Sequence, residues 1–218
     1  MSASARQSST RATARRRRRS RSEGGRLLLA SASPRRRELL ERAGIPCDVA
    51  PVDIAERRAP GEPPHDYVRR LAREKAQTAR RRHPDRVVLG ADTIVVTDGD
   101  VLEKPVDDDD AARMLERLSG RAHDVLTGIA IASASHAQTI VDVIATRVWF
   151  VPLSEADVRW YVATGEPAGK AGAYAIQGLA SRFVSRIEGC YANVVGLPVA
   201  AVLQSLRAAG LQVEGLAG

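Results

Sequence analysis

The 218-residue sequence has few aromatic residues, two cysteines and only three lysines. Aromatic side chains make up 4% of the chain, which is too few to supply the stacking platforms typical of single-strand-binding proteins. Cys47 and Cys190 lie far apart in the sequence and form no CxxC pair, so we expect free thiols in a reducing compartment. A disulfide-stabilised scaffold and a stacking-based nucleic-acid module are therefore not expected.

The chain also lacks a long apolar run. No stretch approaches the roughly 20 residues that a membrane-spanning helix needs. The apolar run at 27–30 is shorter than the roughly 7 to 15 residues of a signal-peptide core. Neither a GxxxxGK(S/T) motif nor a GxGxxG motif after a strand is present, so the common nucleotide-binding folds have no support. We expect a cytoplasmic protein that does not bind a membrane.

Most of the excess positive charge lies in the first 26 residues. The formal net charge is +7, and this segment has nine arginines but one acidic residue, Glu23, so the remainder is nearly neutral. Residues 1–25 have little to bury and are predicted to form a disordered, Arg-rich tail. Three roles for the tail stay open: a leader with no specific function, weak polyanion binding through counterion release, or organelle targeting. The absence of an amphipathic apolar face counts against targeting.

From residue 26 onward, short apolar runs alternate with amphipathic segments. Strands are predicted at 26–31, 47–54, 86–99 (one strand, or two broken at Gly90), 122–134, 138–153 and 181–189. Helices are predicted at 34–44, 65–83, 107–120, 154–165 and 198–210. This order predicts a single α/β domain over 26–218, with a mixed, largely antiparallel central sheet flanked by helices.

Ser31, Ser33, Arg35 and Arg36 lie where the first strand gives way to the first helix. A helix N-terminus already carries partial positive charge, so arginines there are unfavourable unless an anion binds. Free backbone N–H groups and arginine side chains together suit a phosphate. The alternative is a solvated, basic helix start.

Asp92 follows the apolar run at 87–91 and precedes Thr93. A carboxylate beside a buried strand is costly unless it is paired or binds a metal. The alternative is an aspartate that caps a local turn. Because Mg²⁺ prefers one or two carboxylates together with substrate phosphates, Asp92, Glu56 and Glu103 are candidate ligands.

Lys75 and Lys104 stand out in a chain that uses arginine almost everywhere else. A retained lysine indicates a place for a compact, flexible charge, although chance is the alternative.

His123 precedes a strand and is expected to be a structural hydrogen-bonding residue. Gln177, which can read a base edge with both donors and an acceptor, lies in a glycine-rich segment at 165–178. A plain glycine-rich loop is the alternative for that segment.

Seven motifs, in order, resemble those of the Maf family of nucleoside triphosphate pyrophosphatases: ASASPRRRELL, VRRLAREKA, LGADTIV, LEKP, LSGRAHDVLTG, EPAGKAGAYAIQG and YANVVGLP. They run from about residue 27 to the C-terminal helix. Within the family, ADTIV together with AYAIQG resembles the branch that acts on dTTP and UTP. The resemblance implies a fold related to the inosine-triphosphate pyrophosphatases, with two lobes and a cleft. It also implies cleavage between the α- and β-phosphates, a divalent cation (Mg²⁺, with Mn²⁺ or Co²⁺ as alternatives) and a homodimer.

The resemblance also implies residue roles. Asp92 would be the proton acceptor that activates water, with Glu56 and Asp92 placing the metal. Base selection would fall to Arg35, Thr93 and Gln177, and phosphate binding to Ser33, Arg36, Lys75 and Lys104. Arg37 is expected on the helix surface, and Ala55 stands where the family commonly has another acidic residue.

A second function stays open alongside the pyrophosphatase. The same cleft, or the arginine-rich tail, would serve a nucleotide- or nucleic-acid-binding regulator of cell division or septum formation. The buried carboxylate expected at Asp92 favours an enzyme, because a protein that only binds anions gains nothing from it.

Overall fold

A computed structural model describes residues 25–216, so the predicted tail at 1–25 lies almost wholly outside the described residues. The strands form one sheet in the order β2-β1-β3-β5-β6-β7, with β4 paired to β3. They are β1 (Leu27–Leu29), β2 (Cys47–Val49), β3 (Val88–Thr97), β4 (Asp100–Leu102), β5 (Ala122–Ala132), β6 (Ile140–Phe150) and β7 (Val184–Glu188). Strand β1 runs parallel to β2 and β3, and the other pairings are antiparallel. The expected mixed, largely antiparallel sheet flanked by helices is confirmed.

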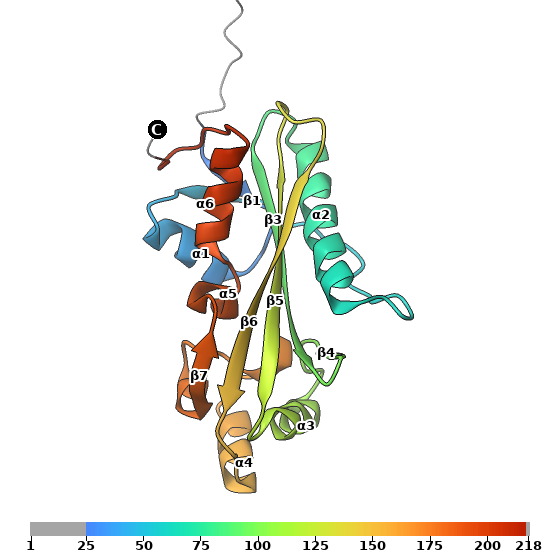
Figure 1. Ribbon diagram of the computed structural model, residues 1–218, viewed down its shortest axis with the longest axis vertical. Coiled ribbons are helices and arrows are strands. Elements are labelled where there is room, and N and C mark those ends of the chain that lie inside the picture. The colour runs from blue at the N-terminus through green and yellow to red at the C-terminus, as the bar shows by residue number, and fades with distance from the viewer. Residues whose placement is uncertain (1–24, 217–218) are drawn as a thin grey trace, which may run out of the picture.

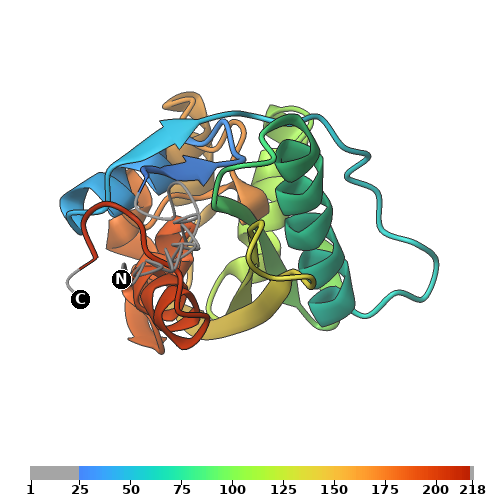
Figure 2. The same cartoon turned by 90° about the horizontal axis from the view of Figure 1, so that it is seen from above.

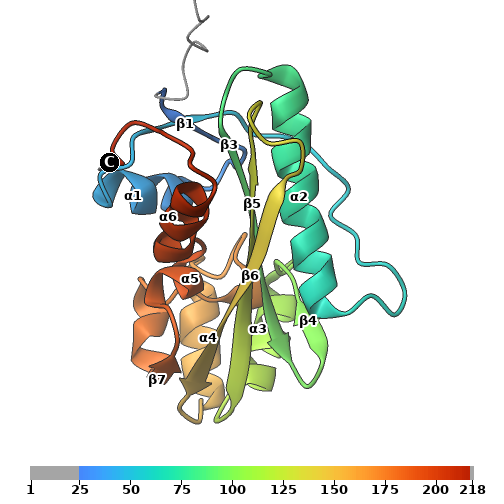
Figure 3. The same ribbon diagram turned by 45° about the horizontal axis from the view of Figure 1, so that its top comes forward.

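The helices cover both faces of this sheet. They are α1 (Pro34–Arg42), α2 (Pro64–Arg82), α3 (Asp108–Leu118), α4 (Glu155–Ala163), η1 (Ala171–Ala173), η2 (Leu179–Phe183), α5 (Tyr191–Val195) and α6 (Val199–Ala208). Helix α2 lies on one face, and α1, α5 and α6 lie on the other (Figures 1 and 2). Helices α3 and α4 lie at the far end of the long strands, as Figure 3 also shows.

Several predicted boundaries need correction. The strand predicted at 47–54 ends at Val49, because the proline-rich segment after it lacks regular structure. The strand predicted at 181–189 begins at Val184, since a 3-10 helix occupies its first residues. Strand β3 continues unbroken through Gly90. The short β4 and α5 were not predicted, because neither has enough residues to show a periodic pattern.

Two glycines let α2 lie directly on the sheet. A Cβ on Gly90 of β3 would lie 2.4 Å from the carbonyl oxygen of Ala72, and a Cβ on Gly128 of β5 would lie 2.4 Å from that of Val68. Both distances are below any real Cβ contact, so only glycine allows this approach. The helix residues that face the sheet are therefore held close to the strands.

The buried side chains fall into two main clusters at the two ends of the sheet. One joins β1, α1 and α6 and contains Leu29, Leu40 and Leu206. The other joins β5, α3 and α4 and contains Leu115 and Tyr161. This division agrees with the two lobes that the resemblance implies. Within residues 25–216, the structure contains no helix with the length and apolar character needed to cross a membrane.

Candidate active site

The site lies at a gap in the edge of strand β3. Strand β1 pairs with β3 only at Val88 and Leu89, and β4 pairs with it only at residues 95–97. In the described part of the chain, no strand covers this edge at 90–94. The free carbonyl of Ala91 accepts a hydrogen bond from Arg36 instead (2.9 Å). Side chains from several elements can therefore converge where β3 is exposed.

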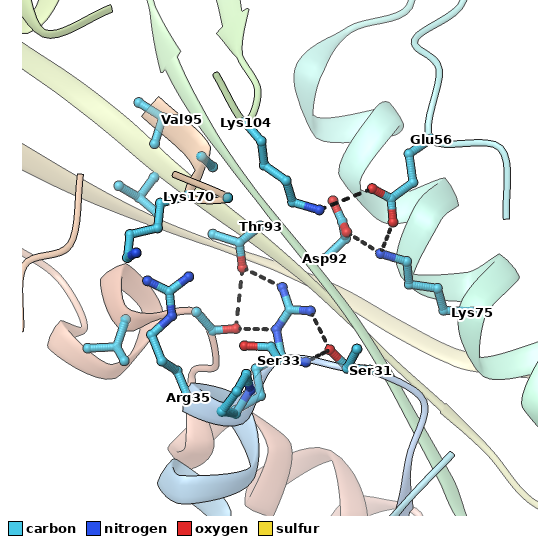
Figure 4. Close-up of a pocket in the computed structure, with 18 of the residues that line it drawn as sticks. Ser31, Ser33, Arg35, Glu56, Lys75, Asp92, Thr93, Val95, Lys104 and Lys170 are labelled. Atoms are coloured by element: carbon cyan, nitrogen blue, oxygen red, sulfur yellow. Dashed lines mark hydrogen bonds and ion pairs between the residues drawn. The ribbon is translucent and has the colours of Figure 1, made fainter. Parts of the chain in front are cut away.

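A cavity of about 620 Å³ occupies this gap (Figure 4). Alternation along β3 sends Asp92 toward α2 and Thr93 toward α1. The predicted site residues that line the cavity are Ser33, Arg35, Arg36, Glu56, Lys75, Asp92, Thr93 and Lys104. Residues from five separate stretches of the sequence thus share one pocket.

The three consecutive arginines at the start of α1 have three different environments. Arg37 lies on the exposed surface, as predicted, and it pairs with Glu41 at 2.7 Å. Arg36 is buried and donates to the carbonyls of Gly196 and Ala91 and to the hydroxyls of Ser31 and Thr93, at 2.8 to 3.0 Å. Arg35 lines the cavity beside them. Two of the three positive charges at the start of α1, those of Arg35 and Arg36, therefore lie at the pocket.

Arg36 is a buried cation, and no carboxylate within residues 25–216 is hydrogen-bonded to it. Burial lowers its pKa, and the negative charge of Asp92 partly offsets that effect. Its four hydrogen bonds use four of the five guanidinium N–H groups, which leaves one on Nη2 for a ligand. Arg36 therefore fixes the shape of the pocket and contributes positive charge to it.

Lys75 joins two carboxylates. Its Nζ lies 2.5 Å from Oδ1 of Asp92 and 2.6 Å from Oε1 of Glu56, while Lys104 lies 3.6 Å from Oε2 of Glu56. Asp92 and Lys75 are buried, whereas Glu56 and Lys104 are more exposed. Burial alone would raise the pKa of Glu56, but the hydrogen bond and charge of Lys75, assisted by Lys104, hold that pKa below its ordinary value.

A third carboxylate lies in a smaller adjoining cavity. Glu103 accepts a hydrogen bond from the hydroxyl of Tyr67 at 2.8 Å, and both residues line this cavity together with Glu56 and Asp92. Burial, followed by the hydrogen bond to Glu103, raises the pKa of Tyr67 above its ordinary value. Tyr67 therefore remains a neutral hydrogen-bond donor that orients Glu103.

The carboxylates fit a divalent cation that also binds substrate. Glu56 and Asp92 both contact one ammonium group, so their oxygens surround a common point suited to positive charge. Within residues 25–216, no group of three or more His, Cys, Asp or Glu side chains forms a closed metal site. Two carboxylates completed by water and phosphate match the ligand preference of Mg²⁺.

A family model described as Maf-like protein matches residues 26–209. The chain belongs to the Maf family. Several of its relatives carry the name dTTP/UTP pyrophosphatase. The protein from Anaeromyxobacter dehalogenans (strain 2CP-C) is 54% identical, over 83% of this chain and 92% of its own. Those from Geobacter sp. (strain M21) and Syntrophomonas wolfei are 52% and 48% identical, over 83% and 84% of this chain and 93% and 97% of theirs.

Among the site residues expected from the Maf resemblance, Gln177 differs from the other eight because it lies outside the cavity. It is exposed and is not among the residues that line the cavity. Ser31, Lys170 and Tyr174 do line it. Ser31 is one of the residues expected at the anion site, and Lys170 lies in the glycine-rich segment at 165–178. Tyr174 could not be recognised, because a tyrosine in a glycine-rich segment is equally typical of a core.

Proposed function

We propose that this protein hydrolyses dTTP and UTP to the nucleoside monophosphate and pyrophosphate. The observation that carries the proposal is the buried contact of Asp92 with Lys75 in a cavity that also holds Glu56, Lys104 and Arg35. Carboxylates able to hold a metal and cations able to bind phosphates thus share one site. The relatives named dTTP/UTP pyrophosphatase support this assignment.

Asp92 would accept the proton of the attacking water. Its Oδ1 is held by Lys75, which leaves Oδ2 for the water. As the water oxygen bonds to the α-phosphorus, the bond from that phosphorus to the bridging oxygen breaks, and pyrophosphate leaves with the bonding electrons. Ser33, Arg36, Lys75 and Lys104 would bind the phosphates, since cations and donors stabilise charge that moves onto the leaving group.

Glu56 and Asp92 would hold the divalent cation, with Mg²⁺ favoured over Mn²⁺ or Co²⁺ because carboxylates and phosphates are hard oxygen ligands. Bound there, the cation would neutralise part of the triphosphate charge and stabilise the leaving pyrophosphate. Arg35 and Thr93 would contribute to base selection from the other side of the pocket. Gln177 would join them only if its exposed segment reaches the bound nucleotide.

The direct test is pyrophosphate release from dTTP, UTP, CTP, GTP, 7-methyl-GTP and ITP, with Mg²⁺ and with EDTA. We expect release from dTTP and UTP that EDTA abolishes. Release of orthophosphate would contradict the assigned bond. Nucleotide binding without turnover would instead support a regulator, and comparison with a chain lacking residues 1–25 would show whether the tail binds polyanions in a salt-sensitive way.

We also propose a cytoplasmic homodimer. The two cysteines among the described residues are free thiols, which suits a reducing compartment. Trp160, Leu179 and Tyr191 are large side chains that are 40 to 47% exposed, and burial against a second copy would remove them from water. Light scattering coupled to size-exclusion chromatography would distinguish a dimer from a monomer.

A further inference from the structure

The cations of the pocket fall into two groups with different partners. All three ion pairs in the cavity are formed by Lys75 or Lys104 with Glu56 or Asp92. Figure 4 shows Arg35 and Lys170 on one side of Thr93, opposite Lys75 and the two carboxylates. Across residues 25–216, neither of these two cations forms an ion pair with a carboxylate. One side of the pocket thus carries both charges, whereas the other carries only cationic donors.

Lys170 is held in this position by backbone carbonyls. Its Nζ donates to the carbonyl oxygen of Glu166 at 2.5 Å and to that of Ala168 at 3.3 Å. An ammonium has three donors, so one remains for a ligand. Burial lowers the pKa of Lys170, and the neighbouring charge of Arg35 lowers it further. The two cations are therefore close enough to repel each other and gain from a shared acceptor.

The carboxylate of Glu166 is already engaged. It accepts a hydrogen bond from the hydroxyl of Tyr161 at 2.7 Å and from the backbone N–H groups of Leu179 and Ala180 at 3.1 and 3.3 Å. These bonds tie α4 to η2 and occupy three acceptor positions of the Glu166 carboxylate. The acidic side chain whose charge acts on both Arg35 and Lys170 is thus committed to the fold, and it is not among the residues that line the cavity.

The segment that follows Lys170 packs rigidly against β3. Gly172 donates its N–H to the carbonyl of Glu103 at 3.0 Å, and its φ of +66° is one that glycine adopts freely. A Cβ there would lie 2.8 Å from Cγ2 of Val95. Ala173 is fully buried with a φ of +58°, a conformation unfavourable for a residue with a Cβ. Such fixed, strained backbone is typical of functional sites.

We infer that Lys170, acting with Arg35, recognises the pyrimidine by donating hydrogen bonds to its ring carbonyl oxygens, with Lys170 donating to the carbonyl at position 4. This inference rests on the proposed function. The metal and phosphates belong on the carboxylate side of the pocket, so the base of an extended nucleotide reaches the side with Arg35 and Lys170. Uracil and thymine present carbonyls at positions 2 and 4, whereas cytosine has an amino group at position 4. Donors that face that amino group stay unpaired, so the pair favours uracil and thymine.

The test compares UTP with CTP, and dTTP with dCTP, in Lys170→Met. Methionine keeps the length of the side chain and removes its charge and donors. We expect kcat/KM for UTP to fall about 10- to 100-fold and that for CTP to change little, because only the uracil complex loses a hydrogen bond to a charged donor. The UTP/CTP ratio should fall by the same factor. Arg159→Met, which removes an exposed cation of α4, is the matched control and should change neither value.

Two outcomes would overturn the inference. Equal losses for UTP and CTP would place Lys170 on the phosphates, on the ribose or on the position-2 carbonyl that both bases share, and unchanged values for both would remove it from the site. Circular dichroism and thermal unfolding of Lys170→Met establish that it is folded. A wild-type protein that releases no pyrophosphate from UTP would refute the proposed function itself, which separates that failure from a failure of the inference.

Discussion

Lys75 and Asp92 form a buried ion pair between helix α2 and strand β3, with Nζ 2.5 Å from Oδ1. Lys75 belongs to α2, which Gly90 and Gly128 allow to lie directly on the sheet. Asp92 belongs to the part of β3 whose edge is not covered by another described strand. The pair therefore depends on the packing of α2 as much as on the two side chains.

Replacement of Asp92 by asparagine should abolish most turnover without unfolding the protein. Asparagine keeps the size of the side chain but cannot accept the proton of water. The expected loss in kcat is about 10²- to 10⁴-fold, the usual contribution of a positioned general base. Steady-state pyrophosphate release and circular dichroism measure the two effects. Near-normal turnover of Asp92→Asn would show that another group activates the water.

Removal of the Lys75 ammonium should make the stability of the protein depend more strongly on Mg²⁺ binding to Asp92 and Glu56. Lys75→Met leaves Asp92 buried and unpaired, and we expect a loss of about 3 kcal/mol in the free energy of unfolding at neutral pH. Mg²⁺ should raise the melting temperature of this variant more than that of the wild type, because it would replace the lost charge between Asp92 and Glu56. Differential scanning calorimetry with and without Mg²⁺ measures both.

A matched control for that variant is Arg117→Met, which breaks the exposed pair of Arg117 with Asp100. It should cost about 0 to 1 kcal/mol and show no additional response to Mg²⁺. If Mg²⁺ stabilises Lys75→Met and the wild type equally, Glu56 and Asp92 do not hold the cation.

Buried His123 should make stability depend on pH. Burial lowers its pKa to about 4, although the charge of Asp124 acts in the opposite direction. Between about pH 4 and the ordinary value near 6.5, the unfolded chain binds a proton that the folded chain does not. Stability from this group is therefore complete above pH 6.5 and falls by about 3 kcal/mol as the pH drops to 4.

The variant His123→Gln tests this expectation, since glutamine retains a polar group for the hydroxyl of Tyr174, 2.9 Å from Nε2 of His123. Urea unfolding at several pH values should show a shallower loss of stability between pH 6.5 and 4 in the variant. Parallel curves for wild type and variant would mean that His123 titrates normally in the folded protein.

The close approach of α2 to the sheet predicts an effect of Gly90→Ala on both stability and activity. The added Cβ would meet the carbonyl of Ala72, so α2 must shift and carry Lys75 away from Asp92. We expect a loss of about 1 to 3 kcal/mol, typical of overpacking, together with a lower kcat. Gly25→Ala, whose Cβ would have no atom of the described residues within 4 Å, should stay within about 0.5 kcal/mol of wild type. If Gly90→Ala were destabilised but kept its kcat, the position of α2 would not control catalysis.

Gln177 offers a test of base selection from outside the cavity. If it reads the base, Gln177→Glu should change the ratio of UTP to GTP turnover while leaving stability nearly unchanged, because the side chain is exposed. Turnover assays with both nucleotides and thermal unfolding measure these quantities. An unchanged ratio would exclude Gln177 from the site.

The sequence by itself determined the order of the longer elements, the mixed sheet and most of the pocket. Apolar periodicity, Pro34 and Gly44 located the helix that carries the arginines, because these signals are local. The resemblance to the Maf family supplied eight residues that line the cavity. The resemblance also predicted the surface position of Arg37, which pairs with Glu41 one turn away.

Only the tertiary structure decided the environment and the partners of each of those residues. Arg35, Arg36 and Arg37 are identical in the sequence, yet Arg36 becomes buried because the uncovered edge of β3 offers it the carbonyl of Ala91. The grouping of Lys75 with two carboxylates, and of Lys170 with Arg35, arises from contacts between elements far apart in the chain. Such contacts depend on how helices pack on the sheet, which no local sequence pattern records.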